Sequence, residues 1–218
     1  MVLIPGLAID ISELGPLVEA LAQRFSVTAV DNLGAGRSDR PDEQYSLERM
    51  GGGASGLLRS RLGPAAVMGI SLGSRIALAL ALRRPELVSR LVLVGGGARV
   101  RRSFANDVLM STVPRVPVGK GRYPQPYCAF RRQRLASQGI DLRGDLALIF
   151  APTLIAHGTR DRIAPRAFAT ELRDGIPHSR LEWFDGGHTF PLGPAGAHWL
   201  AETTAAFVDE TRPGRGGR

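Results

Sequence analysis

Short apolar runs alternate with longer segments of helical periodicity along most of the chain. Runs rich in apolar and β-branched residues predict six buried strands, at Val2–Ile4, Val27–Val30, Ala66–Ile70, Leu91–Val94, Thr153–His157 and Leu181–Phe184. Amphipathic patterns between them predict helices at Leu17–Arg24, Leu72–Arg84, Pro165–Arg173 and Trp199–Glu210. Since strands that alternate with helices pair through crossover connections, this order predicts an α/β fold with a doubly wound, mostly parallel sheet of about six strands.

One stretch departs from this alternation. Residues 98–137 hold a cluster of arginines, several glycines and four prolines, at Pro114, Pro117, Pro124 and Pro126. Because prolines and glycines interrupt regular elements, we expect an insertion over the edge of the sheet and not another strand–helix unit. The sheet domain would then comprise residues 1–97 and 138–211, and residues 212–218, rich in glycine and arginine, would be a disordered tail.

The length of 218 residues suits one domain with a full hydrophobic core. No apolar run approaches the roughly 20 residues that cross a bilayer, and the first residues lack the pattern of a signal peptide. Cys128 is the only cysteine, so no internal disulfide is expected. We therefore expect a cytoplasmic protein without a membrane partner.

The net charge of +8 is concentrated in one segment. Residues 99–134 carry nine of the 28 cationic side chains and a single acid, so the rest of the chain is balanced. This segment is either a solvated basic surface or a positively charged approach to a site for anionic molecules, with Arg99, Arg101 and Arg102 as possible entrance residues. Nucleic-acid binding is disfavoured because no helix-turn-helix, zinc or RNA-recognition pattern accompanies the charge.

The pentapeptide Gly69-Ile70-Ser71-Leu72-Gly73 lies between a predicted strand and a predicted helix. This context exposes a serine hydroxyl above the sheet on a strained turn, where the flanking glycines Gly69 and Gly73 avoid steric clashes. The helix N-terminus also directs its positive dipole at developing oxyanion charge. We therefore predict Ser71 as a nucleophile.

A serine hydroxyl needs a base, and the base needs an orienting acid. Of the four histidines, His188 follows the last predicted strand in a glycine-rich loop that can carry its imidazole to the carboxyl edge of the sheet. His157 ends a strand and is predicted to be a buried, hydrogen-bonded residue, whereas His178 and His198 are expected to be solvated. His188 is the predicted base.

The acid is expected at the carboxyl end of a strand, ahead of the histidine in the chain. Asp161 follows the strand Thr153–His157 and meets this condition. Asp185 competes, but it lies three residues before His188 and fits a turn-former better. The other position for an acid holds only Gly95–Gly97, which favours Asp161.

The oxyanion of an acyl-transfer step needs two backbone donors. One should be the amide of Leu72, directly after the nucleophile. The other is expected in the loop after the first strand, at Leu7, which follows Gly6. No metal or organic cofactor is implied by these residues.

These motifs resemble the α/β-hydrolase superfamily, in its esterase, lactonase and haloperoxidase-like branch, over nearly all of residues 2–210. The loop 31–39 (Asp-Asn-Leu-Gly-Ala-Gly-Arg-Ser-Asp) and the segment 151–161 resemble two further motifs of that branch. The resemblance implies Ser71, Asp161 and His188 as a catalytic triad and Leu7 and Leu72 as oxyanion donors. It also implies that residues 98–137 are a short cap that selects the substrate.

The chain departs from the family pattern in four ways. It begins at what would be the family's third strand, so we expect a newly exposed sheet edge. Pro5 stands before Gly6 where the family has histidine, and Leu33 replaces an arginine that anchors its loop. Four glycines within residues 51–56 cost about 1 kcal/mol each relative to alanine, so we expect a marginal or irregular helix there.

The sequence thus favours a serine hydrolase that cleaves a carboxylic ester, lactone or thioester, with an anionic or carrier-bound substrate as one possibility. The same residues would serve C–C bond hydrolysis, perhydrolysis, or a lyase or cyclase step, and motifs do not separate these reactions. A non-catalytic, ligand-sensing protein of the same fold is the alternative from another class. Substrate identity and oligomeric state stay open.

Overall fold

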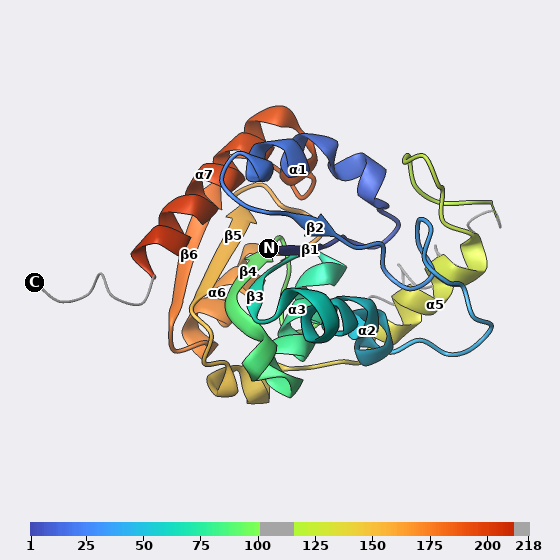
Figure 1. The fold of residues 1–218 in the computed structure, drawn as a ribbon, viewed down its shortest axis with the longest axis horizontal. Helices are drawn as coiled ribbons and strands as arrows, with labels where there is room; N and C mark the ends of the chain where they lie inside the picture. The colour runs from blue at the N-terminus through green and yellow to red at the C-terminus, as the bar shows by residue number, and fades with distance from the viewer. Residues whose placement is uncertain (101–115, 212–218) are drawn as a thin grey trace, which may run out of the picture.

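A six-stranded parallel sheet forms the centre of the molecule (Figure 1). The computed structural model describes residues 1–100 and 116–211. Its strands are β1 (Val2–Ile4), β2 (Thr28–Ala29), β3 (Ala65–Ile70), β4 (Val88–Val94), β5 (Thr153–Gly158) and β6 (Ser179–Phe184), in the order β2-β1-β3-β4-β5-β6. Every neighbouring pair is parallel. The predicted fold class is confirmed.

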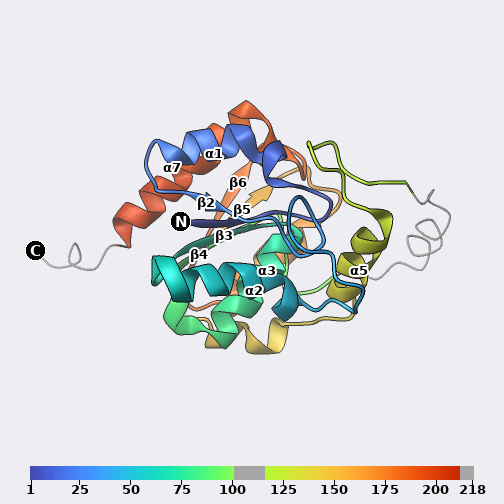
Figure 2. The same ribbon diagram turned by 45° about the vertical axis from the view of Figure 1, so that its right-hand side comes forward.

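Helices cover both faces of the sheet (Figures 1 and 2). The helices α1 (Gly15–Ala22) and α7 (Pro194–Glu210) pack against each other on one face, while α2 (Leu47–Leu57), α3 (Leu72–Arg83) and α6 (Arg166–Gly175) lie on the other. Short helical turns complete the chain: η1 (Ile11–Leu14), η2 (Leu58–Leu62), η3 (Pro85–Leu87), η4 (Arg143–Leu148) and η5 (Phe190–Leu192). Each face encloses its own apolar cluster, as expected when parallel strands are buried on both sides.

The edge of the sheet at β2 is only two residues long. The sequence predicted a sheet edge here, and β2 indeed has one neighbour, β1. A short edge strand offers few unpaired backbone groups to another chain. Among the described residues, no helix combines the length and the apolar character that crossing a membrane requires.

The glycine-rich helix is regular along most of its length. Ser46 caps α2 by accepting a hydrogen bond from the amide of Arg49 at 3.1 Å, and the helix continues to Leu57. The expected irregularity appears only at its end, where η2 is a π-helical turn that stops at Gly63 with φ of 68°. Packing against α3 therefore sustains a helix that intrinsic propensity disfavours.

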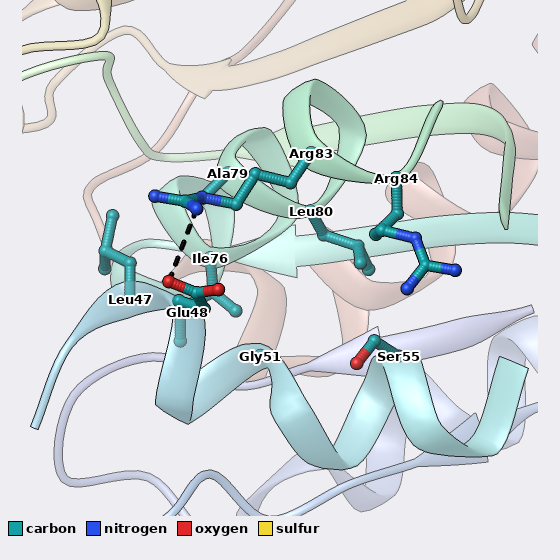
Figure 3. Close-up of a pocket in the computed structure, with 9 residues that line it drawn as sticks. All are labelled: Leu47, Glu48, Gly51, Ser55, Ile76, Ala79, Leu80, Arg83 and Arg84. Atoms are coloured by element: carbon teal, nitrogen blue, oxygen red, sulfur yellow. Dashed lines mark ion pairs between the residues drawn. The ribbon is translucent and has the colours of Figure 1, made fainter. Parts of the chain in front are cut away.

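The helices α2 and α3 leave a small groove between them (Figure 3). Its volume is about 130 Å³, and Glu48 and Arg83 close one end through an exposed ion pair of 3.3 Å. Gly51 and Ser55 present little or no side chain toward α3 along this groove. The groove exists because Gly51 and Ser55 of α2 have too little side chain to fill the space beside α3.

The two ends of the segment between β4 and η4 lie side by side. The amide of Leu142 donates to the carbonyl of Ala98 at 2.9 Å, and Arg99 pairs with Asp141 as an isolated antiparallel bridge. Between these ends lies α5 (Tyr127–Ser137), which stands beside the loop after β2 (Figure 2).

The helix α5 was not predicted, because its apolar pattern is weak among Arg131, Arg132 and Arg134. It is held to the loop after β2 by side-chain contacts: Gln133 Nε2 donates to the carbonyl of Leu33 at 2.7 Å, and Arg132 forms an ion pair with Asp42. The loop that lacks the family's arginine is thus held by α5. The predicted tail, residues 212–218, lies outside the described residues.

Candidate active site

The turn between β3 and α3 holds Ser71 in a backbone conformation that few non-glycine residues adopt. Its φ is 55° and its ψ is −110°. The amide of Ser71 donates to the carbonyl of Val94 on β4 at 2.8 Å. Such strain of about 1–3 kcal/mol persists only where surrounding structure enforces it. The strained strand-to-helix turn expected from the sequence is present.

The two glycines of the pentapeptide are required by close packing of backbone. A Cβ atom at Gly69 would overlap the carbonyl of Gly73, and one at Gly73 would overlap the carbonyls of Ile4 and Pro5 on the β1 side. Neither neighbour is a flexible side chain, so no rotamer change relieves the clash. These glycines bring β1, β3 and α3 together beneath Ser71.

A buried serine that the motif did not single out fastens this turn to β4. Ser74 Oγ donates to the carbonyl of Gly69 at 2.7 Å and accepts from the amide of Val94 at 3.1 Å. Ser74 is fully buried. Its place three residues after Ser71, on the face of α3 that the helical pattern turns toward the sheet, is the only signal that could have identified it.

The structure brings the three predicted site residues into one hydrogen-bonded chain. His188 Nε2 lies 2.9 Å from Ser71 Oγ, and His188 Nδ1 lies 2.7 Å from Asp161 Oδ2. Because an ionised carboxylate only accepts, Nδ1 donates to Asp161, and Nε2 is left to accept from the serine hydroxyl. The hydroxyl, the imidazole and the carboxylate therefore have the order that proton transfer from serine requires.

The Asp161 carboxylate is held ionised and fixed in orientation. Burial raises its pKa, but hydrogen bonds from His188 and from the amides of Ala164 and Ile163 outweigh burial, so the pKa lies below its ordinary value. Both amides donate to Oδ1 at 2.8 Å. Oδ2 is thus left for His188.

The remaining acid and histidine candidates lie as the sequence suggested. His157 is fully buried, with Nε2 2.9 Å from the carbonyl of Ala164, and burial lowers its pKa. His178 and His198 are exposed. Asp185 is exposed and pairs with Arg160 at 2.8 Å.

The end of β4 faces the site without supplying an acid. A Cβ atom at Gly95 would lie 3.6 Å from His188 and 3.7 Å from Asp161. These are ordinary van der Waals distances, so it is the φ of 56° at Gly95, and not a lack of space, that favours glycine here.

The two residues predicted as oxyanion donors line the same cavity as Ser71 and His188. Leu72 is the first residue of α3. Leu7 follows Gly6, which lies so near Ser71 that a Cβ atom on Gly6 would sit 3.3 Å from Ser71 Cβ. Asn32 Nδ2, in the loop after β2, donates to the carbonyl of Pro5 at 2.8 Å and so holds the loop of Leu7 in place.

The cavity has a volume of about 210 Å³. Ile163, Ala164 and Phe168 give it an apolar wall, and Arg75 of α3 and Arg134 of α5 also line it. No aspartate or glutamate is among the described residues that line it. The cavity is therefore apolar on one side and cationic on another.

Of the three predicted entrance arginines, only Arg99 lies among the described residues. Arg99 is held by Glu171, with Nε to Oε2 at 3.1 Å, and its guanidinium lies over the ring of Phe168 at 5.1 Å. It is not among the residues that line the cavity. Arg101 and Arg102 lie outside the described residues. Within those residues no cluster of histidine, cysteine, aspartate or glutamate has the make-up of a metal site.

Comparison with known proteins gives matches in sequence and in structure. A family model described as the alpha/beta hydrolase fold matches residues 1–113. The putative carbamate hydrolase RutD of Azorhizobium caulinodans is 30% identical over 208 residues, which cover 80% of this chain and 78% of that protein.

Two solved structures superpose over nearly the whole chain. A hydrolase from Pseudomonas aeruginosa gives a TM-score of 0.84 at 20% identity, covering 95% of this chain and 88% of the other. The enol-lactonase from Burkholderia xenovorans gives a TM-score of 0.79 at 25% identity, covering 95% of this chain and 90% of the other. The first likeness concerns the fold alone.

Proposed function

Because the chain belongs to the alpha/beta-hydrolase fold family, we propose that it is a serine hydrolase that cleaves a carboxylic ester, lactone or thioester through an acyl-enzyme on Ser71. The observation that carries this proposal is the continuous hydrogen-bonded chain from Asp161 through His188 to Ser71. Relatives named as a lactonase and a carbamate hydrolase support chemistry at an acyl carbon.

In the acylation step, Ser71 Oγ attacks the acyl carbon of the substrate while His188 Nε2 takes the hydroxyl proton. Asp161 stabilises the imidazolium that results and keeps the proton of Nδ1 in place. His188 then gives its Nε2 proton to the departing alcohol or thiol. The product of this half-reaction is an ester of Ser71.

The tetrahedral intermediate carries its negative charge on the former carbonyl oxygen. We assign the amides of Leu7 and Leu72 as the donors that stabilise this oxygen, aided by the positive end of α3. Loss of one such donor costs about 2.7–4 kcal/mol in comparable enzymes. The hydrogen bond from Asn32 to Pro5 would support the donor on the first loop.

In the deacylation step a water molecule attacks the acyl carbon. His188 takes one proton from the water and returns it to Ser71 Oγ, which leaves as the restored hydroxyl. The acid product departs, and no other reactant is needed.

Residues 98–137 would form the cap over this site. Two contacts support that role: the ends of the segment are joined by the Ala98–Leu142 hydrogen bond, and Arg134 from α5 lines the cavity. The residues that differ between family members with different substrates would then lie between these ends.

The test is labelling by a fluorophosphonate probe, with Ser71→Ala as the matched control. The wild type should be labelled and should hydrolyse 4-nitrophenyl acetate, and the variant should lose both properties, with a rate loss of at least about a thousandfold. A soluble, folded wild type that is not labelled would contradict the proposal. A panel of esters, lactones and thioesters then separates the substrate classes.

A further inference from the structure

Arg75 lies in the candidate site but takes no part in the proposed acyl transfer. It follows Ser71 by four residues, so it stands about one turn along α3 on nearly the same side of the helix. It lines the same cavity as Ser71, Leu72 and His188. The side chain is therefore close to any substrate bound at the nucleophile.

The guanidinium of Arg75 has no partner among the described residues. Its Nε atom is shielded from solvent and makes no hydrogen bond, while the residue as a whole is half-buried. Burial without a counter-ion lowers the pKa of Arg75 to about 10, which still leaves it charged at neutral pH. Partial burial of a cation without a counter-ion costs free energy, which an anionic group bound in the cavity would offset.

The other arginines of this region already have partners. Arg134, which also lines the cavity, is engaged in an interaction of its own. Arg99 is neutralised by Glu171, and Arg83, on α3 but outside the cavity, pairs with Glu48 (Figure 3). Arg75 differs from both because its charge faces the cavity and lacks an acid. Arg75 lies outside the cationic segment 99–134, so it was not singled out from the sequence.

A carboxylate is the group that matches an unpaired guanidinium best, because it accepts two parallel hydrogen bonds from one planar fork. We infer that Arg75 binds a second, unreactive carboxylate of the substrate, so that this hydrolase prefers esters or lactones of dicarboxylic acids. The reacting carbonyl would lie at Ser71, and the free carboxylate would lie a short acyl chain away. The apolar wall of Ile163 and Phe168 would then contact the methylene groups between them.

This inference rests on the proposed function, and its test compares two isosteric methyl esters. Monomethyl glutarate carries the free carboxylate, whereas methyl glutaramate carries a neutral amide of the same shape. Wild-type protein should hydrolyse the carboxylate ester with a kcat/KM at least about 30-fold higher.

Arg75→Met should lower kcat/KM for monomethyl glutarate by about 30- to 100-fold and change that for methyl glutaramate by less than about threefold. Arg75→Lys, which keeps the charge but loses the planar fork, should recover part of the preference. Arg83→Gln is the matched control, since it removes an arginine from the same helix outside the cavity, and it should leave both rates unchanged.

The thermal stability of Arg75→Met distinguishes carboxylate binding by Arg75 from a purely structural role. If Arg75 serves to bind a carboxylate, Arg75→Met should raise the thermal midpoint of the unliganded protein by about 2 °C, because it removes a half-buried charge that has no counter-ion. A lowered midpoint, together with equal losses of rate on both esters, would overturn the inference.

Binding to inactive protein separates this inference from the proposed reaction. In the Ser71→Ala background, monomethyl glutarate should raise the thermal midpoint, and the added Arg75→Met substitution should abolish that shift. If the wild type cleaves no ester, the proposed function fails. The thermal-shift measurement on the Ser71→Ala protein still decides whether Arg75 binds a carboxylate. Absence of the shift, or equal wild-type rates on the two esters, would refute carboxylate recognition by Arg75.

Discussion

Two regions of this molecule are rich in glycine for opposite physical reasons. At the turn that holds Ser71, a Cβ atom on Gly69 or Gly73 would overlap backbone carbonyl groups. In α2, a Cβ atom on Gly52, Gly53 or Gly56 would meet nothing within 4 Å. The first region uses glycine because nothing else fits, and the second carries glycine where most residues would fit better.

The difference shows what each region has to maintain. The turn at Ser71 must hold β1, β3 and α3 at distances that leave no space for a side chain, so stability and reactivity depend on the same atoms. The helix α2 only has to cover the sheet, and its packing against α3 compensates for the weak helix propensity of its sequence. Replacing glycine by alanine should therefore lower the free energy of unfolding at the turn of Ser71 and raise it in α2, and the two changes should also differ in size.

The largest effect is expected from Gly73→Ala. The new Cβ would displace the carbonyl groups of Ile4 and Pro5, which belong to the sheet and to the loop carrying Leu7. We expect a loss of more than about 3 kcal/mol in the free energy of unfolding, together with near-complete loss of esterase activity. Urea denaturation alongside Gly53→Ala provides the matched comparison, and similar midpoints for the two variants would contradict the steric argument.

A combined Gly52→Ala, Gly53→Ala and Gly56→Ala variant should be stabilised. Each alanine removes unfolded-state freedom in a helical position with open space, so the three together should add about 1.5–3 kcal/mol. Esterase rates should stay within about twofold of the wild type, since α2 does not line the cavity. Thermal unfolding is the direct measurement, and a lowered midpoint would show that these glycines serve a purpose that space alone does not reveal.

The backbone strain at Ser71 predicts a smaller difference between two inactive variants. Ser71→Gly relaxes a residue at φ of 55°, whereas Ser71→Ala keeps the strain. The glycine variant should be more stable than the alanine variant by about 1 kcal/mol, even though glycine usually destabilises. Equal midpoints in denaturant would mean that the turn is not strained.

Gly51 lies between the two extremes. A Cβ atom there would sit 3.2 Å from Ile76 Cγ2 of α3, which is tight but adjustable. The gain in helix propensity and the cost of moving Ile76 should nearly cancel, so Gly51→Ala should change stability by less than about 0.5 kcal/mol. A stabilisation as large as that of Gly52→Ala alone would show that α2 and α3 separate freely.

The last prediction concerns the stability of the folded protein at low pH. The folded-state pKa of Asp161 is lowered, so its ionised form stabilises the protein above about pH 4, and this contribution is lost as the pH falls through the folded pKa. Asp161→Asn should therefore flatten the dependence of unfolding free energy on pH below about pH 4. The α2 triple-alanine variant should keep the wild-type dependence, and a steep acid limb in Asp161→Asn would exclude this carboxylate as its source.

Sequence patterns predicted what local chemistry dictates. The strands were predictable because parallel strands buried on both faces are continuous apolar runs, and Ser71 because its two glycines stand between a strand and a helix. The positions of Asp161 and His188 followed from the ends of two strands. The catalytic roles of these residues remain predictions that the proposed labelling and kinetics would test.

What the sequence did not predict depends on contacts between distant segments. The helix α5 lacks a clear apolar stripe, and it is held by Gln133 and Arg132 to a loop about 90 to 100 residues away. Arg99 and Arg75 carry the same charge in the sequence, but only the fold reveals that Glu171 neutralises one and that nothing described neutralises the other. Pairing of charges is a tertiary property that composition does not report.

The hydrogen bond between Ala98 and Leu142 has a consequence for how this enzyme could diversify. Since these two residues, one after β4 and one before β5, are hydrogen-bonded to each other, residues inserted or deleted between them need not displace either strand. The entropy of closing such a loop grows only logarithmically with its length, so a doubling costs about 0.6 kcal/mol. If this segment is the proposed cap, exchanging it with that of a relative should alter substrate selectivity while Ser71, Asp161 and His188 keep their hydrogen-bonded arrangement.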